Sequence, residues 1–221
     1  MNGESTAHVI GALTTPLWVL LAFYVVWLLR KQIPGAVGRL TGLEAFGLKL
    51  ALSGGEAMDA AIELAEKNPN WPVEVSAADR KAAIDRANAH RSVFEGAEIL
   101  WVDDVPSNNR NESRMLRSFG ALITFAATTD EALAALRTSV MQNKPFHIIL
   151  SDIGRGLPHP EPTAGLLMLP RLREAGFHQP VIYYIGTPKP DAGVPPGAFG
   201  LTHRPDELLQ LVTDALSRVR G

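Results

Sequence analysis

The chain has 221 residues, of which 46% are hydrophobic, so its length and composition fit one folded domain with an appendage and exclude a fully disordered chain. Its 21 Lys and Arg residues against 23 Asp and Glu residues leave a net charge of -2, which excludes a generally basic surface for nucleic acid. The absence of cysteine excludes disulfides, thiolate metal sites and cysteine nucleophiles, and it is typical of a reducing compartment.

An uncharged apolar stretch stands near the start of the chain. As a helix, residues 9–29 would span roughly 32 Å, which matches the hydrocarbon core of a bilayer. Trp18, Tyr24 and Trp27 add amphipathic aromatic rings of the kind that gather at membrane interfaces. A buried soluble helix and a cleaved signal peptide fit less well, because the stretch is long and no Lys or Arg precedes it. The pattern predicts a single transmembrane helix that anchors the chain in the lipid bilayer.

Basic residues flank this stretch on its C-terminal side. Arg30, Lys31 and Arg39 follow it, whereas residues 1–8 contain no Lys or Arg. By the positive-inside rule, residues 1–8 are expected to be extracytoplasmic and the C-terminal part of the chain cytoplasmic. The predicted location is therefore the inner (cytoplasmic) membrane, with a single crossing.

The juxtamembrane region, residues 30–96, is expected to hold a linker, a short strand and helices. Residues 44–52 alternate apolar and other side chains with the period of a strand, although a short helix also fits. A lone strand needs a partner, either in the sheet of its own chain or in a neighbouring subunit. This segment is therefore a weak indication of a homo-oligomer.

Two capping patterns predict helices in the same region. Ser53 with Glu56 opens a helix that runs to about Lys67. Ser76 with Asp79 opens a second, charged helix that runs to about residue 94. The apolar positions of this second helix are sparse, so it is expected on a surface or at an interface.

Residues 97–221 alternate short apolar runs with segments of helical periodicity. The runs occupy residues 98–102, 121–126, 146–151, 180–185 and 198–202. Continuous apolar strands that alternate with helices predict an α/β fold, with a doubly wound five-stranded parallel sheet. In such sheets the functional site lies outside the carboxyl ends of the strands.

Three aspartates stand at predicted strand ends. Asp103 and Asp104 follow the first run, and Asp152 follows the third. The three carboxylates could converge, and a hard cation such as Mg²⁺ would relieve their repulsion. Asp152 could then act as a nucleophile toward a phosphoryl group. The alternative is an ordinary strand-end turn before a helix that Ser107 caps.

Several motifs in this region together resemble a known family. From about residue 97 to residue 220 the chain contains, in order, ILWVDDVPSNN, HIILSDIGRG, AGLLMLPRLREAG, PVIYYIG and GAFGLTHRPDELL. This series resembles the receiver domain of bacterial response regulators. The resemblance implies a flavodoxin-like fold with strand order 2-1-3-4-5. It further implies Mg²⁺ held by Asp103, Asp104 and Asp152, and transfer of a phosphoryl group from a histidine kinase to Asp152.

Individual positions depart from the pattern of the family. Ile185 stands where receivers carry a Thr or Ser whose hydroxyl bonds the phosphoryl oxygen, and Thr187 lies two residues farther on. Arg204, before Pro205, stands where receivers carry the Lys that pairs with the phosphoryl group, and this exchange alters the geometry of the contact. Arg155 is either a solvated loop charge or an anion partner near the pocket.

Two proline-rich segments are also unusual. Residues 186–200 contain four prolines, which preclude a regular helix of normal length between the fourth and fifth strands. Residues 153–165 form a longer and more proline-rich loop than receivers carry, and this loop could cover the pocket. The output surface of ordinary receivers is therefore not expected to be intact.

These patterns lead to two functional expectations. The first is a non-enzymatic, membrane-anchored signalling protein that binds Mg²⁺, accepts a phosphoryl group on Asp152 and acts through protein–protein contacts. The alternative is an oligomeric membrane effector, a ring or a pore, controlled by a receiver-like domain that is not phosphorylated. The sequence contains no Gly-rich phosphate loop, zinc-protease helix motif or Gly-x-Ser-x-Gly elbow that would indicate another chemistry.

Overall fold

A computed structural model describes residues 54–68, 73–155, 163–186 and 193–221. The predicted membrane span at residues 9–29 and the predicted strand at residues 44–52 lie outside these ranges, so both stay predictions. Within the described ranges, no helix is both long enough and apolar enough to cross a membrane.

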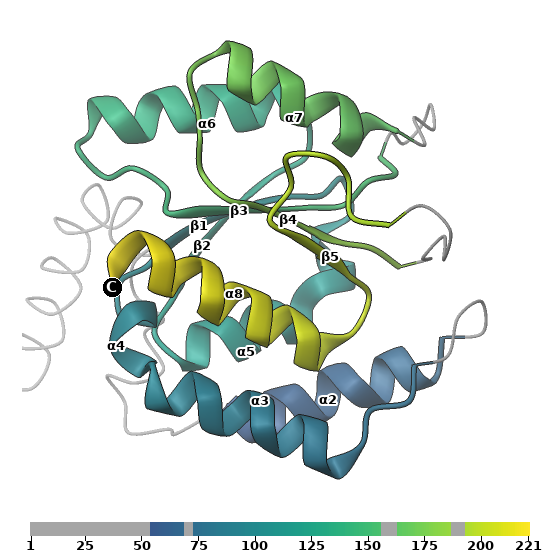
Figure 1. The fold of residues 1–221 in the computed structure, drawn as a ribbon. Coiled ribbons are helices and arrows are strands. Elements are labelled where there is room, and N and C mark those ends of the chain that lie inside the picture. Colours follow the sequence, from purple (N-terminus) through teal and green to yellow (C-terminus); the bar gives the residue numbers. More distant parts are fainter. Residues whose placement is uncertain (1–53, 69–72, 156–162, 187–192) are drawn as a thin grey trace, which may run out of the picture. The chain divides into compact units, whose positions relative to one another are not determined.

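Five parallel strands form one sheet in the order β2-β1-β3-β4-β5 (Figure 1). The strands are β1 (Glu98–Val102), β2 (Leu122–Ala126), β3 (Ile148–Ser151), β4 (Val181–Tyr184) and β5 (Gly200–Thr202). The register pairs Val102 with both Ala126 and Ser151, so the carboxyl ends of β1, β2 and β3 lie level. This order is that of a flavodoxin-like doubly wound sheet, and it confirms the fold predicted for residues 97–221.

Two pairs of helices cover the two faces of the sheet (Figure 1). They are α5 (Arg110–Ser118) and α8 (Pro205–Arg220) on one face, and α6 (Thr129–Met141) and α7 (Ala164–Glu174) on the other. Neighbouring strand residues enter opposite cores: Trp101 and Tyr184 pack with α5 and α8, whereas Leu100 and Tyr183 pack with α6 and α7. Because both faces are buried, the central strands are apolar along their whole length.

Two further helices lie outside α5 and α8 (Figure 1). They are α2 (Gly54–Glu66), which contacts α5 and α8, and α3 (Ala77–Ala89), which contacts α8. Met58 of α2 is fully buried in the core that α5 and α8 share with the sheet. The ion pairs Arg80–Asp59 and Arg86–Asp214 join α3 to α2 and to α8. The described helices of residues 54–94 therefore belong to the same compact unit as the sheet.

The second predicted helix of this region is divided in the structure. It begins as predicted, because Ser76 Oγ accepts a hydrogen bond of 3.0 Å from the Asp79 N–H. At His90 the backbone leaves the helical region, with φ of -109° and ψ of 25°, and the short α4 (Arg91–Phe94) follows. α4 carries Phe94, which is fully buried and packs against the Phe119 ring. The break between the two helices thus lets the Phe94 side chain point into the core.

The connection from β4 to β5 differs from the other connections. Helices follow β1, β2, β3 and β5, but the described residues between β4 and β5 form turns and no helix. Residues 187–192 of this proline-rich connection lie outside the described ranges. Proline removes a backbone donor and clashes with the preceding helical turn, which accounts for the missing helix in the described part.

Candidate functional site

Asp103 and Asp104, which follow β1, and Asp152, which follows β3, are together called the acid site. The Asp103 N–H donates to the Ala126 carbonyl at 2.9 Å, and the Asp152 N–H donates to the Val102 carbonyl at 3.0 Å. Sheet hydrogen bonding therefore continues one residue past each strand. These bonds place the two aspartates at the same edge of the sheet, close enough for the charge of Asp103 to act on Asp152.

Asp103 holds the turn that follows β1. Its Oδ1 accepts from the Val105 N–H at 2.6 Å, and its Oδ2 accepts from the Asn109 side-chain amide at 2.6 Å. Asn109 closes the short helix η3 (Pro106–Asn109), which leads into α5. Burial raises the pKa of Asp103, and the two hydrogen bonds act in the opposite direction. The cap predicted at Ser107 is wrong, since neither η3 nor α5 has a side-chain cap bond.

Asp152 is half-buried, and its Oδ1 accepts a hydrogen bond of 2.7 Å from the Ile153 N–H. Burial, together with the negative charges of Asp103 and Asp104, raises the pKa of Asp152 to about 6. The carboxyl is therefore mostly ionised at neutral pH, but it takes up a proton more readily than an ordinary aspartate.

Arg155 is a buried cation beside the aspartates. Its side chain is 5% exposed, so it is not a solvated loop charge. Burial lowers the pKa of Arg155, whereas the charges of Asp152, Asp103 and Asp104 favour its ionised form. Its Nη2 lies 3.5 Å from Thr129 Oγ1, and within the described part of the chain Nε and Nη1 have no hydrogen-bond partner. Buried donors without partners are costly, which makes this guanidinium a candidate anion ligand.

Arg204, the predicted phosphoryl-pairing residue, points to α3 and α8. Its Nε and Nη2 donate to the two carboxylate oxygens of Asp206 at 3.1 and 2.8 Å. Asp79 lies 3.5 Å and Glu207 lies 3.3 Å from the same guanidinium. Because Asp206 is only 1% exposed, Arg204 neutralises a buried carboxylate. Sequence reasoning missed this competitor two residues away, and the phosphoryl-pairing role stays a prediction.

Ile185 stands at the predicted switch position, and its side chain is apolar and buried. It is buried in the core that α6 and α7 share with the sheet, and its N–H donates to the Thr202 carbonyl at 3.0 Å. Its side chain offers no hydrogen-bonding group, and Thr187 lies outside the described residues. Residue 185 therefore supplies no hydroxyl to the acid site.

The predicted magnesium ligands are Asp103, Asp104 and Asp152. In the described part of the chain, no group of three or more His, Cys, Asp or Glu side chains is spaced to hold a metal. Both carboxylate oxygens of Asp103 already accept hydrogen bonds. The positive charge of Arg155 interacts with the charges of Asp103, Asp104 and Asp152. These contacts neither place nor exclude a divalent ion at the three aspartates, so Mg²⁺ binding stays a prediction.

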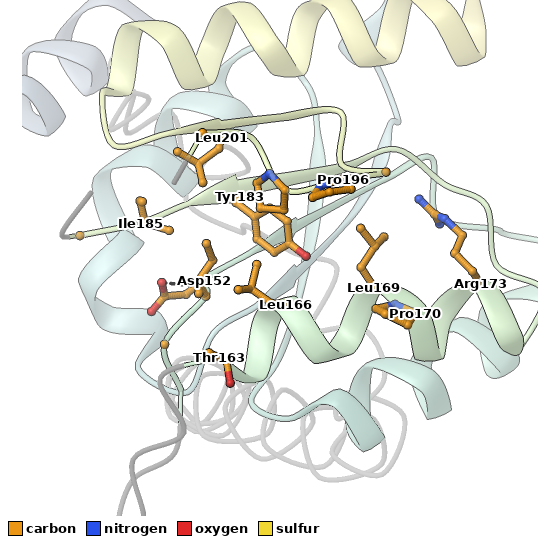
Figure 2. A pocket seen from close by; sticks show the side chains of 16 residues that line it. Asp152, Thr163, Leu166, Leu169, Pro170, Arg173, Tyr183, Ile185, Pro196 and Leu201 are labelled. Carbon is orange, nitrogen blue, oxygen red and sulfur yellow. Dashed lines mark hydrogen bonds between the residues drawn. The ribbon is translucent and has the colours of Figure 1, made fainter. Parts of the chain in front are cut away.

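A pocket of about 850 Å³ opens beside Asp152 (Figure 2). Leu169 of α7 lies on one side of it, and Tyr183 of β4 and Pro196 lie on the other. Arg173 lies at the end of the pocket away from Asp152. The sequence signal nearest to this pocket was the proline-rich connection between β4 and β5, which predicted that no regular helix forms there but did not predict a pocket.

Gly165 lets α7 approach the end of β3. Its N–H donates to the Ile153 carbonyl at 2.8 Å, and its carbonyl accepts from the Tyr183 hydroxyl at 2.9 Å. A Cβ on Gly165 would lie 2.7 Å from the Ile153 Cα and nearer still to the Asp152 carbonyl oxygen. The first turn of α7 thus fixes the backbone that carries Asp152. Residues 156–162, most of the loop predicted to cover the pocket, lie outside the described ranges.

A second polar cluster is buried on the opposite face of the sheet. The Tyr184 hydroxyl donates to Glu112 Oε1 at 2.9 Å, and Glu112 is 4% exposed. Burial raises the pKa of Glu112. Among the described residues, Glu112 Oε2 and the Trp101 indole N–H have no hydrogen-bond partner. This cluster lies in the core with α5 and α8, so it is separate from the acid site.

Comparisons with known proteins give structural likenesses. No protein-family model and no curated protein matches the chain. The chain is similar to a chemotaxis response regulator of Vibrio cholerae, with 24% identity and a TM-score of 0.43, over 54% of this chain and 98% of that one. A response regulator receiver domain protein of Clostridium thermocellum shows 20% identity and a TM-score of 0.43, over 55% and 95% of the two chains.

An anti-anti-sigma factor of Bartonella quintana is also similar. Its identity is 21% and its TM-score 0.43, over 65% of this chain and 57% of that one. Of these three structures, the first two are a response regulator and a receiver domain protein. The assignment of the flavodoxin-like fold rests on the strand order and register described above.

Proposed function

We propose that residues 97–221 are the regulated part of a signalling protein, that Asp152 accepts a phosphoryl group, and that output passes through protein–protein contacts. The observation that carries this proposal is a half-exposed Asp152 at the end of β3 within electrostatic reach of the buried Arg155, whose Nε and Nη1 have no hydrogen-bond partner among the described residues. The proposed role is that of a regulated acceptor rather than an enzyme.

The chemistry is a transfer between two carriers. A carboxylate oxygen of Asp152 attacks the phosphorus, a new P–O bond forms, and the bond to the donor breaks. With a histidine kinase as donor the broken bond is P–N, and the imidazole leaves. At pH 7 a carboxyl with a pKa of about 6 is ionised about ten times more often than it is protonated, so the nucleophile is available.

Arg155 is proposed to stabilise the transferred group. The three aspartates repel an incoming phosphoryl group, and Arg204 is engaged by the buried Asp206. The unpartnered Nε and Nη1 of Arg155 are donors that phosphoryl oxygens could accept from, and such charge-assisted bonds are strong in a buried site. Arg155 would then supply the cation that the resemblance assigns to Arg204.

Membrane anchoring is a further part of the proposal. It is supported by the uncharged stretch at residues 9–29 and by the basic residues that follow it. The acceptor domain would then work at the cytoplasmic face of the inner membrane. A reporter fused to the C-terminus should be active in the cytoplasm, and activity confined to the periplasm would contradict this orientation. Assembly of a homo-oligomer through residues 44–52 stays a prediction.

The test uses the full-length protein and acetyl phosphate as donor. Wild type should gain one acid-stable but hydroxylamine-sensitive acyl phosphate, and Asp152→Asn should gain none. Arg155→Gln should react at least about tenfold more slowly, because it loses a charged group that contacts the transferred phosphoryl. Asp130→Asn and Arg171→Gln, an exposed pair on α6 and α7, are matched controls and should react like wild type.

The same reaction decides between the alternatives. Runs with Mg²⁺ and with EDTA measure whether the transfer depends on the metal. A wild-type protein that gains no phosphoryl group under either condition, or an Asp152→Asn variant that still gains one, would contradict the acceptor role. The remaining interpretation would be a receiver-like domain that is not phosphorylated.

A further inference from the structure

The space beside Asp152 arises from the way the sheet is covered. α6 and α7 lie on one face, and the connection from β4 to β5 adds no helix to that face within the described residues. Among the described residues, part of the surface of β4 and β5 is therefore not covered by a helix. Between α7 and these strands a pocket of about 850 Å³ is left, a volume typical of small-molecule sites.

The walls of this pocket are mainly apolar. α7 contributes Leu166 and Leu169, and the strands contribute Tyr183, Ile185 and Leu201 (Figure 2). The Tyr183 hydroxyl is already bonded to the Gly165 carbonyl, so this side chain presents its ring rather than a polar group. The middle of a ligand in this pocket must accordingly be apolar.

The two ends of the pocket carry opposite charges. Thr163 and Arg173 both line it, and along α7 they are ten residues apart, which corresponds to about 15 Å. Asp152 lies at the Thr163 end (Figure 2). The Arg173 guanidinium is held by donation to the carbonyls of Phe177 at 2.8 Å and Gln179 at 3.2 Å. These bonds use two of its five N–H groups and orient the others.

This distribution of charge selects a class of ligand. An anionic group is favoured at Arg173 and disfavoured at the Asp152 end, where Asp103 and Asp104 add negative charge and where the buried Arg155 is not among the described lining residues. A hydrogen-bond donor such as an amine is favoured at the Asp152 end. A nucleotide, which carries several negative charges on a polar body, matches neither the walls nor that end.

We propose that this pocket binds an elongated amphipathic organic molecule, with its apolar body between α7 and β4–β5, an anionic group at Arg173 and a donor group at Asp152. The proposal concerns ligand binding and does not depend on phosphoryl transfer. Occupancy would place the ligand in contact with Asp152, so the ligand and the state of that carboxyl would influence each other.

The test uses three twelve-carbon probes with the full-length protein. They are the amino acid with its amine at the far end of the chain, dodecanoic acid and dodecylamine, and binding is measured by isothermal titration calorimetry. Arg173→Gln should weaken the two acids about tenfold and leave dodecylamine unchanged. Asp152→Asn should weaken the two amines by a similar factor and leave dodecanoic acid no weaker. The molecule with both groups should bind wild type most tightly.

A pair of neighbouring leucines locates the binding site. Leu166 lines the pocket, whereas Leu167 is 61% exposed on the outer side of α7. Leu166→Trp should fill the pocket and abolish binding, and Leu167→Trp should bind like wild type. Probe uptake by residues outside the pocket would be equal in both variants. Equal binding by the two variants, or no binding of any probe to wild type, would overturn the proposal.

Discussion

Removal of Arg204 should destabilise the fold, because it would leave the carboxylate of Asp206 buried without its cation. Asp206 is 1% exposed, and the Arg204 side chain is 23% exposed. Breaking a buried pair by removing one partner costs about 3–5 kcal/mol, and the partial exposure of Arg204 places this pair near the lower value. We therefore expect Arg204→Ala to lower the free energy of unfolding by about 3 kcal/mol.

Thermal unfolding followed by circular dichroism measures this change. For a chain of this size, about 3 kcal/mol corresponds to a fall in Tm of roughly 6–12 °C. The surface pair Arg171–Asp130 is the matched control, since its side chains are 50% and 81% exposed. Arg171→Ala should lower the free energy of unfolding by at most about 1 kcal/mol.

A double variant tests the cause of the effect. In Arg204→Ala with Asp206→Asn the buried charge is gone, so the double variant should be more stable than Arg204→Ala alone. If the single variant lost less than about 3 °C in Tm, or if the double variant were no more stable, the reasoning would be refuted. Arg204 would then be available for a role at the acid site.

Three other changes have outcomes that follow from the structure. Gly165→Ala should lower the free energy of unfolding, measured by urea denaturation, by about 1–3 kcal/mol, because the new Cβ would meet the backbone around Asp152. Gly186→Ala is the control and should change the free energy of unfolding little, because a Cβ there would have open space around it. Burial raises the pKa of Glu112, so the contribution of this side chain to stability is highest below the ordinary value of 4.5 and is lost as pH rises. The Tm of wild type relative to that of Glu112→Gln should therefore fall with rising pH. A constant difference between the two Tm values would contradict this. The stability contribution of Asp152 should also fall as pH rises, because its pKa is raised to about 6. Measured relative to Asp152→Asn, this contribution should disappear between pH 3.8 and about 6. An increase over that range would rule out the raised pKa.

The fold was accessible from the sequence because each element leaves a local signal. Strands buried on both faces are continuously apolar, and the five predicted runs contain the five observed strands. The aspartates at strand ends were also predictable, since parallel strands bring their carboxyl ends to one edge. Asp103 and Asp152 meet there because their own N–H groups continue the hydrogen bonding of the sheet.

The direction of the charged side chains was less accessible, because it depends on residues distant in the chain. Arg204 matches a family position, but it turns to the buried Asp206 and toward Asp79 of α3. Arg155 follows β3 in a segment that sequence patterns cannot place, and its buried guanidinium lies against Thr129 of α6 and Met168 of α7. The pocket could not be predicted either, since it depends on how α7, β4 and β5 pack together rather than on any residue type.

The layer of α2 and α3 determines where the smallest independently folding fragment can begin. Met58 is fully buried in one cluster with Met115 of α5 and Leu208 of α8. A fragment cut at residue 97, where the family resemblance starts, would remove Met58 and leave apolar side chains of α5 and α8 facing water. Such a fragment should aggregate or unfold at low temperature, and a soluble fragment should include α2.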